Sequence, residues 1–139
     1  MDLIPNPMDK GLTPDTYFPV FALIVDHFSR YVYFEGMPDN STDSVIKVLN
    51  AYTAMLQSKG LIQKLSYLRA DAGSCFTSKE FLEWAVDNNI NVSLAAPRHQ
   101  EQNSICERAW QTLHYMGASM LVHSHLSNIF FYHSHKYAS

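Results

Sequence analysis

The sequence predicts an α/β fold: a mixed five-stranded sheet, with a three-strand antiparallel meander followed by parallel strands, flanked by helices. An early series of β-branched and aromatic segments, separated by short turns, predicts the meander. A later alternation of short apolar segments with segments of three-four periodicity predicts parallel strands, because strands joined through a helix run in the same direction. The length of 139 residues suits one domain with a hydrophobic core.

The three strands of the meander lie within the first 35 residues. Residues 1–4 form a short apolar strand that carries Asp2. Residues 17–25 are rich in β-branched and aromatic side chains, which predicts a buried strand. A tight connection at 26–30 leads into a third strand at 31–35, so the second and third strands form a β-hairpin.

A helix is predicted after the turn at 38–42, which is rich in capping residues. Its apolar residues recur at three- and four-residue spacing: Val45, Val48, Leu49, Tyr52, Met55 and Leu56. Gly60 is expected to end this helix, because glycine readily adopts the left-handed conformation found past helix C-termini.

Two short strands and a helix are predicted next. Residues 65–70 form a buried strand that leads into Asp71. The spacing Thr77-x-x-Glu80 is that of a capping box, and it predicts a helix with Phe81, Trp84 and Ala85 on one face. The last strand is predicted by alternating apolar residues: Ile90, Val92 and Leu94.

The longest helix is expected to begin at Ser104 and a further helix to cover residues 126–137. The predicted core stripe of the long helix contains Ile105, Ala109, Leu113, Met116 and Met120. This order of elements is the ribonuclease-H-like arrangement, whose active site lies at the end of adjacent central strands with help from one helix. We expect residues 1–139 to be a single domain of this kind that is truncated at both ends.

Composition excludes several classes of protein. A net charge of −3 argues against a basic module that binds nucleic acid by bulk electrostatics. No apolar segment approaches the length of a membrane span, and no secretory leader is seen. We therefore expect Cys75 and Cys106 to be reduced thiols of an intracellular protein, although a disulfide is conceivable if the two carboxylates beside them converge.

Those two carboxylates are Asp71, at the end of a predicted strand, and Glu107, in the first turns of the long helix, with 107 − 71 − 1 = 35 residues between them. A strand-end aspartate and a helix-borne glutamate can converge on one point, where hard oxygen ligands hold Mg²⁺. Each has a simpler explanation. Ser104-x-x-Glu107 is also a capping box, the helix face with Glu107, Gln111 and His114 can be a solvated face, and Asp71 can be an ordinary turn residue.

Several longer segments resemble one family. These are VDHFSRY at 25–31, LRADAG at 68–73 with FTSKEF at 76–81, and APRHQEQN at 96–103 with Glu107-Arg108. The tail, with Leu126, residues 130–132 and residues 136–138, also matches. In this order they resemble the integrase catalytic core of copia-type LTR retrotransposons, within the DDE polynucleotidyl transferases. The resemblance spans nearly the whole chain.

The resemblance implies a third carboxylate on the first strand, and hence a triad of Asp2, Asp71 and Glu107. Asp26 is the alternative first carboxylate, although it lies where the family has the turn of the hairpin. The implied cofactor is a pair of Mg²⁺ or Mn²⁺ ions, held by Asp2 and Asp71 with Glu107 completing one shell. The implied reaction is processing of DNA 3′ ends and strand transfer into target DNA.

The implied partners are the DNA ends of the element, target DNA, and further copies of the chain in a dimer or higher multimer. We expect DNA contacts from Arg98, His99, Gln102, Asn103 and Arg108, whose side chains can bind phosphates or base edges. A solvated surface loop is the alternative for these residues. The family acts in the nucleus, reached through a cytoplasmic particle.

Four residues differ from the family pattern without removing a carboxylate: Pro5, Ala72, Cys75 and Ser104. They replace small or hydrogen-bonding neighbours that shape the loops around the site. The alternative function is therefore a catalytically decayed or co-opted integrase relic that acts only as a nucleic-acid-binding or dimerisation module.

Overall fold

The computed structural model describes residues 1–6, 17–62, 64–95 and 104–139, and its strands form two ladders. The antiparallel ladder has the order β1-β2-β3, and β4 pairs with β5 in parallel. Their bounds are β1 Asp2–Pro5, β2 Val20–Val25, β3 Val32–Met37, β4 Tyr67–Ala70 and β5 Asn91–Leu94. The predicted meander and parallel pair are thus both present, but within the described residues the ladders do not form a single five-stranded sheet.

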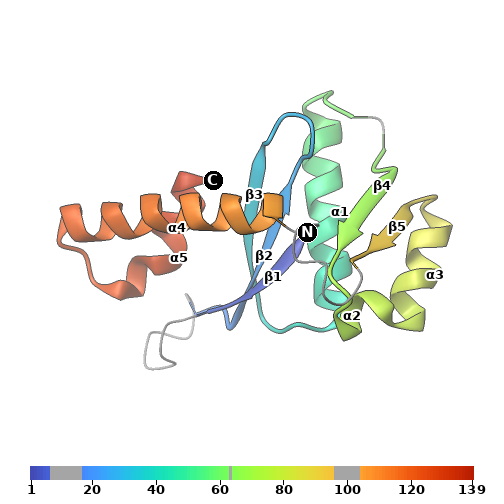
Figure 1. Ribbon diagram of the computed structural model, residues 1–139, viewed down its shortest axis with the longest axis horizontal. Helices are drawn as coiled ribbons and strands as arrows, with labels where there is room; N and C mark the ends of the chain where they lie inside the picture. Colours follow the sequence, from blue (N-terminus) through green and yellow to red (C-terminus); the bar gives the residue numbers. More distant parts are fainter. Residues whose placement is uncertain (7–16, 63, 96–103) are drawn as a thin grey trace.

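A hydrogen bond from the amino terminus connects the two ladders. The amino group of Met1, next to the first residue of β1, donates to the carbonyl oxygen of Arg69 in β4 over 2.7 Å. Asp2 pairs with Leu23 on the other side of β1. The start of β1 therefore lies between β2 and β4, close to the centre of the molecule (Figure 1).

The helices are α1 Thr42–Ser58, α2 Ser74–Thr77, α3 Lys79–Asp87, α4 Ser104–Ser124, the 3₁₀ turn η3 Asn128–Phe130, and α5 Phe131–Ala138. α1 covers one face of the antiparallel ladder and α4 and α5 cover the other, whereas α3 packs on β5 (Figure 1). No helix among the described residues is long and apolar enough to cross a membrane. The last predicted helix, at 126–137, is in fact divided into η3 and α5, and Leu126 precedes both.

Two apolar clusters lie on opposite faces of β2, because successive side chains of a strand point to opposite faces. Ala22 and Ile24 belong to a first cluster with side chains of α1, α3 and β4. Phe21 and Leu23 belong to a second cluster with side chains of α4 and α5. A residue of β1 therefore faces α1 or α4 according to which residue of β2 it opposes.

The ends of the first helices follow local chemistry, with one correction. Gly60 has a φ of +68°, which confirms it as the left-handed residue after α1. The predicted capping box at Thr77 is wrong. Thr77 is the last residue of α2, and its hydroxyl donates to carbonyl groups within that turn. Ser78 caps α3 instead, accepting from the backbone N–H of Phe81.

The buried face of α4 is rotated from the predicted stripe. Leu113 is buried as expected, but Met116 is 44% exposed, and the other buried residues are Cys106, Gly117 and Leu121. The sequence suggested that His114 lies on a solvated face. In the structure its side chain is half-buried and forms a hydrogen bond with His135 of α5. The rotation arises because α4 packs against α5 as well as against the sheet. The imidazole of His135 on α5 lies against Gly117 and His114, so these residues of α4 face inward.

A polar cluster around Glu35 anchors α5 to β3. Lys136 donates to Glu35 Oε2 over 2.8 Å and to the carbonyl oxygen of Phe34 over 2.7 Å. Tyr132 donates to Glu35 Oε1 over 2.8 Å. Desolvation alone would raise the pKa of Glu35, but the hydrogen bonds from Lys136 and Tyr132 outweigh it and hold the pKa below its usual value.

Gly117 allows α4 and α5 to approach closely. A Cβ at Gly117 would lie 2.5 Å from Nδ1 of His135, a side chain with no exposed surface. His135 is held in place by Phe131, whose ring stacks on the imidazole at 3.9 Å between centroids. Its Nδ1 also lies 2.8 Å from the carbonyl oxygen of Phe131. The imidazole therefore has no room to move away from a larger residue.

We expect Gly117→Ala to destabilise the protein by about 2 kcal/mol, because the methyl group overlaps the fixed imidazole. At an exposed helix position, replacing glycine by alanine stabilises a protein by about 0.5–1 kcal/mol. The sign of the change in unfolding free energy therefore shows whether His135 packs against Gly117. Urea unfolding of the variant measures the change, with Ser119→Ala on the exposed side of α4 as control. A stabilised Gly117→Ala variant would show that the two helices do not pack as described.

Candidate active site: three carboxylates

Asp2 is directed toward α4 by the register of β1. Directly opposed residues of an antiparallel pair point to the same face, and Asp2 opposes Leu23, which packs in the cluster with α4 and α5. The carboxylate is half-buried, and its Oδ1 accepts from the backbone N–H of Leu3 over 3.0 Å. The sequence placed Asp2 on the first strand, as observed.

Asp71 follows the last residue of β4, also as predicted, and its half-buried side chain bends back over its own turn. Oδ1 accepts from the backbone N–H of Gly73 over 3.3 Å. A Cβ at Gly73 would lie 3.1 Å from the same oxygen, so this tight turn favours glycine. Oδ2 of Asp71 takes part in none of the hydrogen bonds found among the described residues.

Glu107 lies in the first turn of α4, and its side chain is exposed. The positive end of the helix dipole favours a carboxylate in this turn. Ser104 is the first described residue of α4, because the residues before it lie outside the description. The Ser104 hydroxyl accepts from Arg108 Nη2 over 3.3 Å.

The pKa of Asp2 is raised from its usual value by desolvation and, in part, by the other two carboxylates. Desolvation is the largest cause raising the pKa of Asp2, and the negative charges of Asp71 and Glu107 raise it further. The amino terminus and the N–H of Leu3 act in the opposite direction but do not cancel the effect. Within the described residues, however, no three potential ligands are close enough together to hold one ion as they stand.

Asp26, the alternative first carboxylate, has a different role. Oδ2 accepts from both the backbone N–H and the hydroxyl of Ser29, each over 2.6 Å, and these bonds close the turn of the hairpin. The same hydrogen bonds lower the pKa of Asp26, as expected for a turn carboxylate that accepts several of them. Of the two candidates, Asp2 has the environment of a residue facing other carboxylates.

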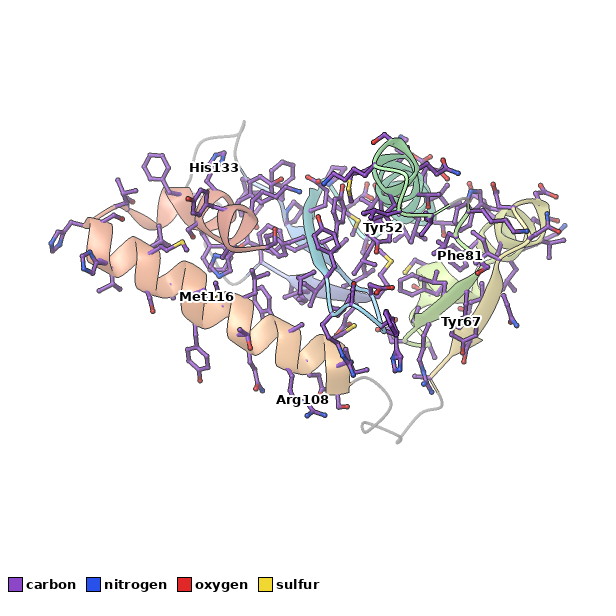
Figure 2. All side chains as sticks on the ribbon, turned by 90° about the horizontal axis from the view of Figure 1, so that it is seen from above. Tyr52, Tyr67, Phe81, Arg108, Met116 and His133 are labelled. Atoms are coloured by element: carbon purple, nitrogen blue, oxygen red, sulfur yellow. The ribbon has the colours of Figure 1, made fainter. Side chains whose placement is uncertain are left out.

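Most of the predicted DNA contacts lie outside the described residues: Arg98, His99, Gln102 and Asn103. Arg108 is described and exposed, and Figure 2 shows it on the outer side of the first turns of α4. Its Nε donates to the carbonyl oxygen of Ser104 over 3.2 Å. The guanidinium is therefore held against Ser104, one turn back along α4.

Both cysteines are free and buried, in agreement with the expected reduced thiols. Burial is the largest cause raising the pKa of Cys75, and the charge of Asp71 adds to it, so this thiol stays protonated at neutral pH. Cys75 and Cys106 belong to different apolar clusters. Although each cysteine is close in sequence to a site carboxylate, the two thiols therefore pack in clusters on opposite faces of β2.

The family is shown by a direct comparison. A model described as an integrase core domain matches residues 2–100. The chain belongs to the integrase core domain family. The matched region includes Asp2 and Asp71 and ends before Glu107, so the family match itself does not include the glutamate.

Curated relatives of this integrase core are viral polyproteins. The chain is 29% identical over 97 residues to the Pro-Pol polyprotein of Feline foamy virus, and 27% identical over 97 residues to that of Simian foamy virus type 1. Each match covers 70% of this chain and 8% of the relative. The chain therefore spans less than a tenth of the length of these curated relatives.

Solved structures similar to this integrase core share its fold. The catalytic core domain of BIV integrase matches with a TM-score of 0.60 and 18% identity, covering 86% of this chain and 71% of that one. The HTLV-2 integrase catalytic core domain in complex with magnesium matches with a TM-score of 0.60 and 21% identity, covering 86% of this chain and 71% of that one. A chain from the structure of the simian T-cell lymphotropic virus intasome in complex with PP2A regulatory subunit B56 gamma matches with a TM-score of 0.71 and 17% identity. The match covers 86% of this chain and 40% of that one.

We expect Asp2→Asn to stabilise the protein without divalent cations, and to do so more at pH about 7.5 than at pH about 4.5. The raised pKa means that the fold favours protonated Asp2, so its ionisation costs stability as the pH rises above the usual carboxyl value of 3.8. Thermal unfolding should show a gain of about 1–3 °C at the higher pH. Asp87→Asn, at an exposed position, is the control, and a gain independent of pH would contradict the shared negative charge.

Proposed function

We propose that this chain is the catalytic core of a retroelement integrase that transfers polynucleotide strands with Asp2, Asp71 and Glu107 as its catalytic carboxylates. The observation that carries the proposal is the placement of Asp2, which the register of β1 directs to the α4 face and which lies next to the bond that joins Met1 to β4. The raised pKa of Asp2, caused by burial together with the charges of Asp71 and Glu107, agrees with this placement. Integrase cores are polynucleotidyl transferases, and membership of this family supports the same type of reaction for this chain. The reaction would comprise 3′-end processing and strand transfer into target DNA.

The donor set fits hard divalent cations. Asp2, Asp71 and Glu107 offer oxygen ligands only, and the repulsion that Asp2 experiences is relieved by positive charge. The HTLV-2 core was solved in complex with magnesium, which supports Mg²⁺ as the ion. When bound, a pair of Mg²⁺ or Mn²⁺ ions would activate the attacking oxygen and stabilise the leaving oxygen of an in-line displacement.

The residues of the chain then have distinct tasks. Asp2 of β1 and Asp71, which follows β4, would hold the cations, and the bond from Gly73 N–H orients one oxygen of Asp71 while leaving the other for a cation. Glu107 of α4 would supply a further carboxylate ligand. Arg108, fixed on Ser104, binds a backbone phosphate of the DNA next to the reacting bond.

We also propose that the chain works as part of a multimer on DNA, in the nucleus, after arrival in a cytoplasmic particle. The simian T-cell lymphotropic virus neighbour is an intasome chain, and the HTLV-2 core was solved in a trimeric form. Arg98, His99, Gln102 and Asn103 would contact DNA along with Arg108. The motif resemblance suggests a copia-type retrotransposon as the source, whereas the curated relatives above are foamy-virus polyproteins.

A decayed relic is the second candidate. It is favoured by the departures at Ala72 and Cys75, and by the absence, among the described residues, of three ligands already close enough for one ion. A relic would fold normally but would neither bind divalent cations at Asp71 nor cut DNA.

We expect the protein to cut and join a branched DNA mimic of the strand-transfer product in Mg²⁺ or Mn²⁺. Asp2→Asn, Asp71→Asn and Glu107→Gln should each reduce the rate by at least about hundredfold, because each removes a ligand of the reaction. Asp26→Asn is the matched control and should retain activity within about threefold. Gel assays of DNA products measure the rates, and circular dichroism confirms that each variant is folded.

Two results would contradict this assignment. Loss of activity in Asp26→Asn with retention in Asp2→Asn would make Asp26 the first carboxylate. A folded parent protein with no DNA products, and no heat of Mg²⁺ binding in calorimetry, would favour the relic.

A further inference from the structure

A group of hydroxyls ties the first residue of α1 to the junction of α2 and α3. Thr42 Oγ1 lies 2.9 Å from Ser78 Oγ and 3.3 Å from the carbonyl oxygen of Cys75. Ser78 Oγ donates to the same carbonyl oxygen over 3.1 Å. These three residues form what we call the Thr42–Ser78 clasp, which joins segments more than thirty residues apart in sequence.

The clasp satisfies groups that the short helices leave without partners. Ser78 Oγ accepts from the N–H of Phe81 and so caps α3. The carbonyl oxygen of Cys75 belongs to α2, a helix of only four residues, whose last carbonyl groups have no partners within the helix. Because Ser78 must both cap α3 and donate to Cys75, the Thr42 hydroxyl is the additional polar group that holds α2 and α3 at a fixed angle.

Thr42 acts from a rigid support. Ser41 caps α1 by accepting from the N–H of Ser44. Asp39 Oδ1 accepts from the N–H of Ser41 and from the hydroxyl of Ser44. Val45, one turn further on, has no exposed surface. The first turn of α1 is therefore fixed both by polar bonds and by core packing, and it can restrain whatever Thr42 contacts.

The restraint leads to Asp71. The carbonyl oxygen of Gly73 accepts from the N–H groups of Phe76 and Thr77, so α2 moves as a unit with Gly73. The N–H of Gly73 in turn donates to Asp71 Oδ1. Thr42 is therefore connected through α2 and Gly73 to an oxygen of one of the three carboxylates, although it touches none of them.

We propose that Thr42 is a positioning residue for the carboxylate site, and that its hydroxyl holds the α2 turn so that Asp71 keeps the orientation that binds a divalent cation. The proposal rests on the function proposed above. A residue that only caps a helix would change overall stability, whereas a positioning residue changes the affinity for the cation and the mobility of residues 71–78. Partners of metal ligands typically affect metal affinity by about 10–100-fold.

Thr42→Val tests the clasp, because it removes the hydroxyl and keeps the shape of the side chain. Thr42→Ser restores the hydroxyl. Thr53→Val is the matched control, since Thr53 is also a half-buried threonine of α1 and its hydroxyl donates to the carbonyl oxygen of Leu49 within the helix. Two quantities are measured for each variant: the Mg²⁺ concentration that gives half-maximal DNA cleavage, and amide hydrogen exchange of residues 71–78 without metal.

We expect Thr42→Val to raise the half-maximal Mg²⁺ concentration about tenfold and to speed exchange in residues 71–78. Thr42→Ser should remain within about twofold of the parent on both measures, and Thr53→Val should match the parent. Equal changes in Thr42→Val and Thr53→Val, or unchanged exchange in Thr42→Val, would overturn the positioning role. An inactive parent whose exchange still depends on Thr42 would overturn the proposed function and leave the clasp supported.

Discussion

The register of β1 is the constraint on which the carboxylate site depends. The side chains of a strand alternate between faces, so a shift of one residue against β2 would exchange every residue of β1 between the two apolar clusters. Asp2 would then face α1 and lose its proximity to Glu107. Leu23 fixes the observed face from one side, and the hydrogen bond from Met1 to Arg69 fixes the position of β1 against β4 from the other.

The third carboxylate depends on how α4 is held. The side chain of Glu107 is exposed and forms none of the hydrogen bonds found among the described residues. The position of its carboxylate therefore depends on where the backbone of α4 lies. α4 packs on α5 through Gly117 and His135, and α5 is attached to β3 by the Lys136–Glu35 ion pair with Tyr132. Unlike an exposed pair such as Lys47–Asp43, this ion pair is partly withdrawn from water and hydrogen-bonded on both sides. The far end of the fold therefore helps to place Glu107.

Local patterns in the sequence predicted the elements better than their faces. The apolar spacing of α1 identified its buried side, and Asp2, Asp71 and Glu107 were placed on the correct elements, because strand ends and helix starts leave local signals. The sequence pattern places the cap of α3 at Thr77 instead of Ser78, because both hydroxyls suit a cap and the pattern does not reveal that Thr77 belongs to the preceding helix α2. The α4 stripe was misplaced because His135, a polar residue in sequence, is fully buried against it.

Among the described residues, no side-chain ion pair neutralises the carboxylates of the site, and the positive charge that acts on Asp2 is that of the amino terminus. The ion pairs found among the described residues use Asp43, Glu83 and Glu35, and none uses the three site carboxylates. The nearest basic neighbour along α4, Arg108, is turned onto Ser104. The groups that orient Asp2 and Asp71 are backbone N–H groups, which supply direction without a full positive charge. Neutral hydrogen bonds hold like charges near one another only at a cost in the stability of the folded protein. The same negative charges attract a cation, so binding of a cation to the folded protein would offset that cost.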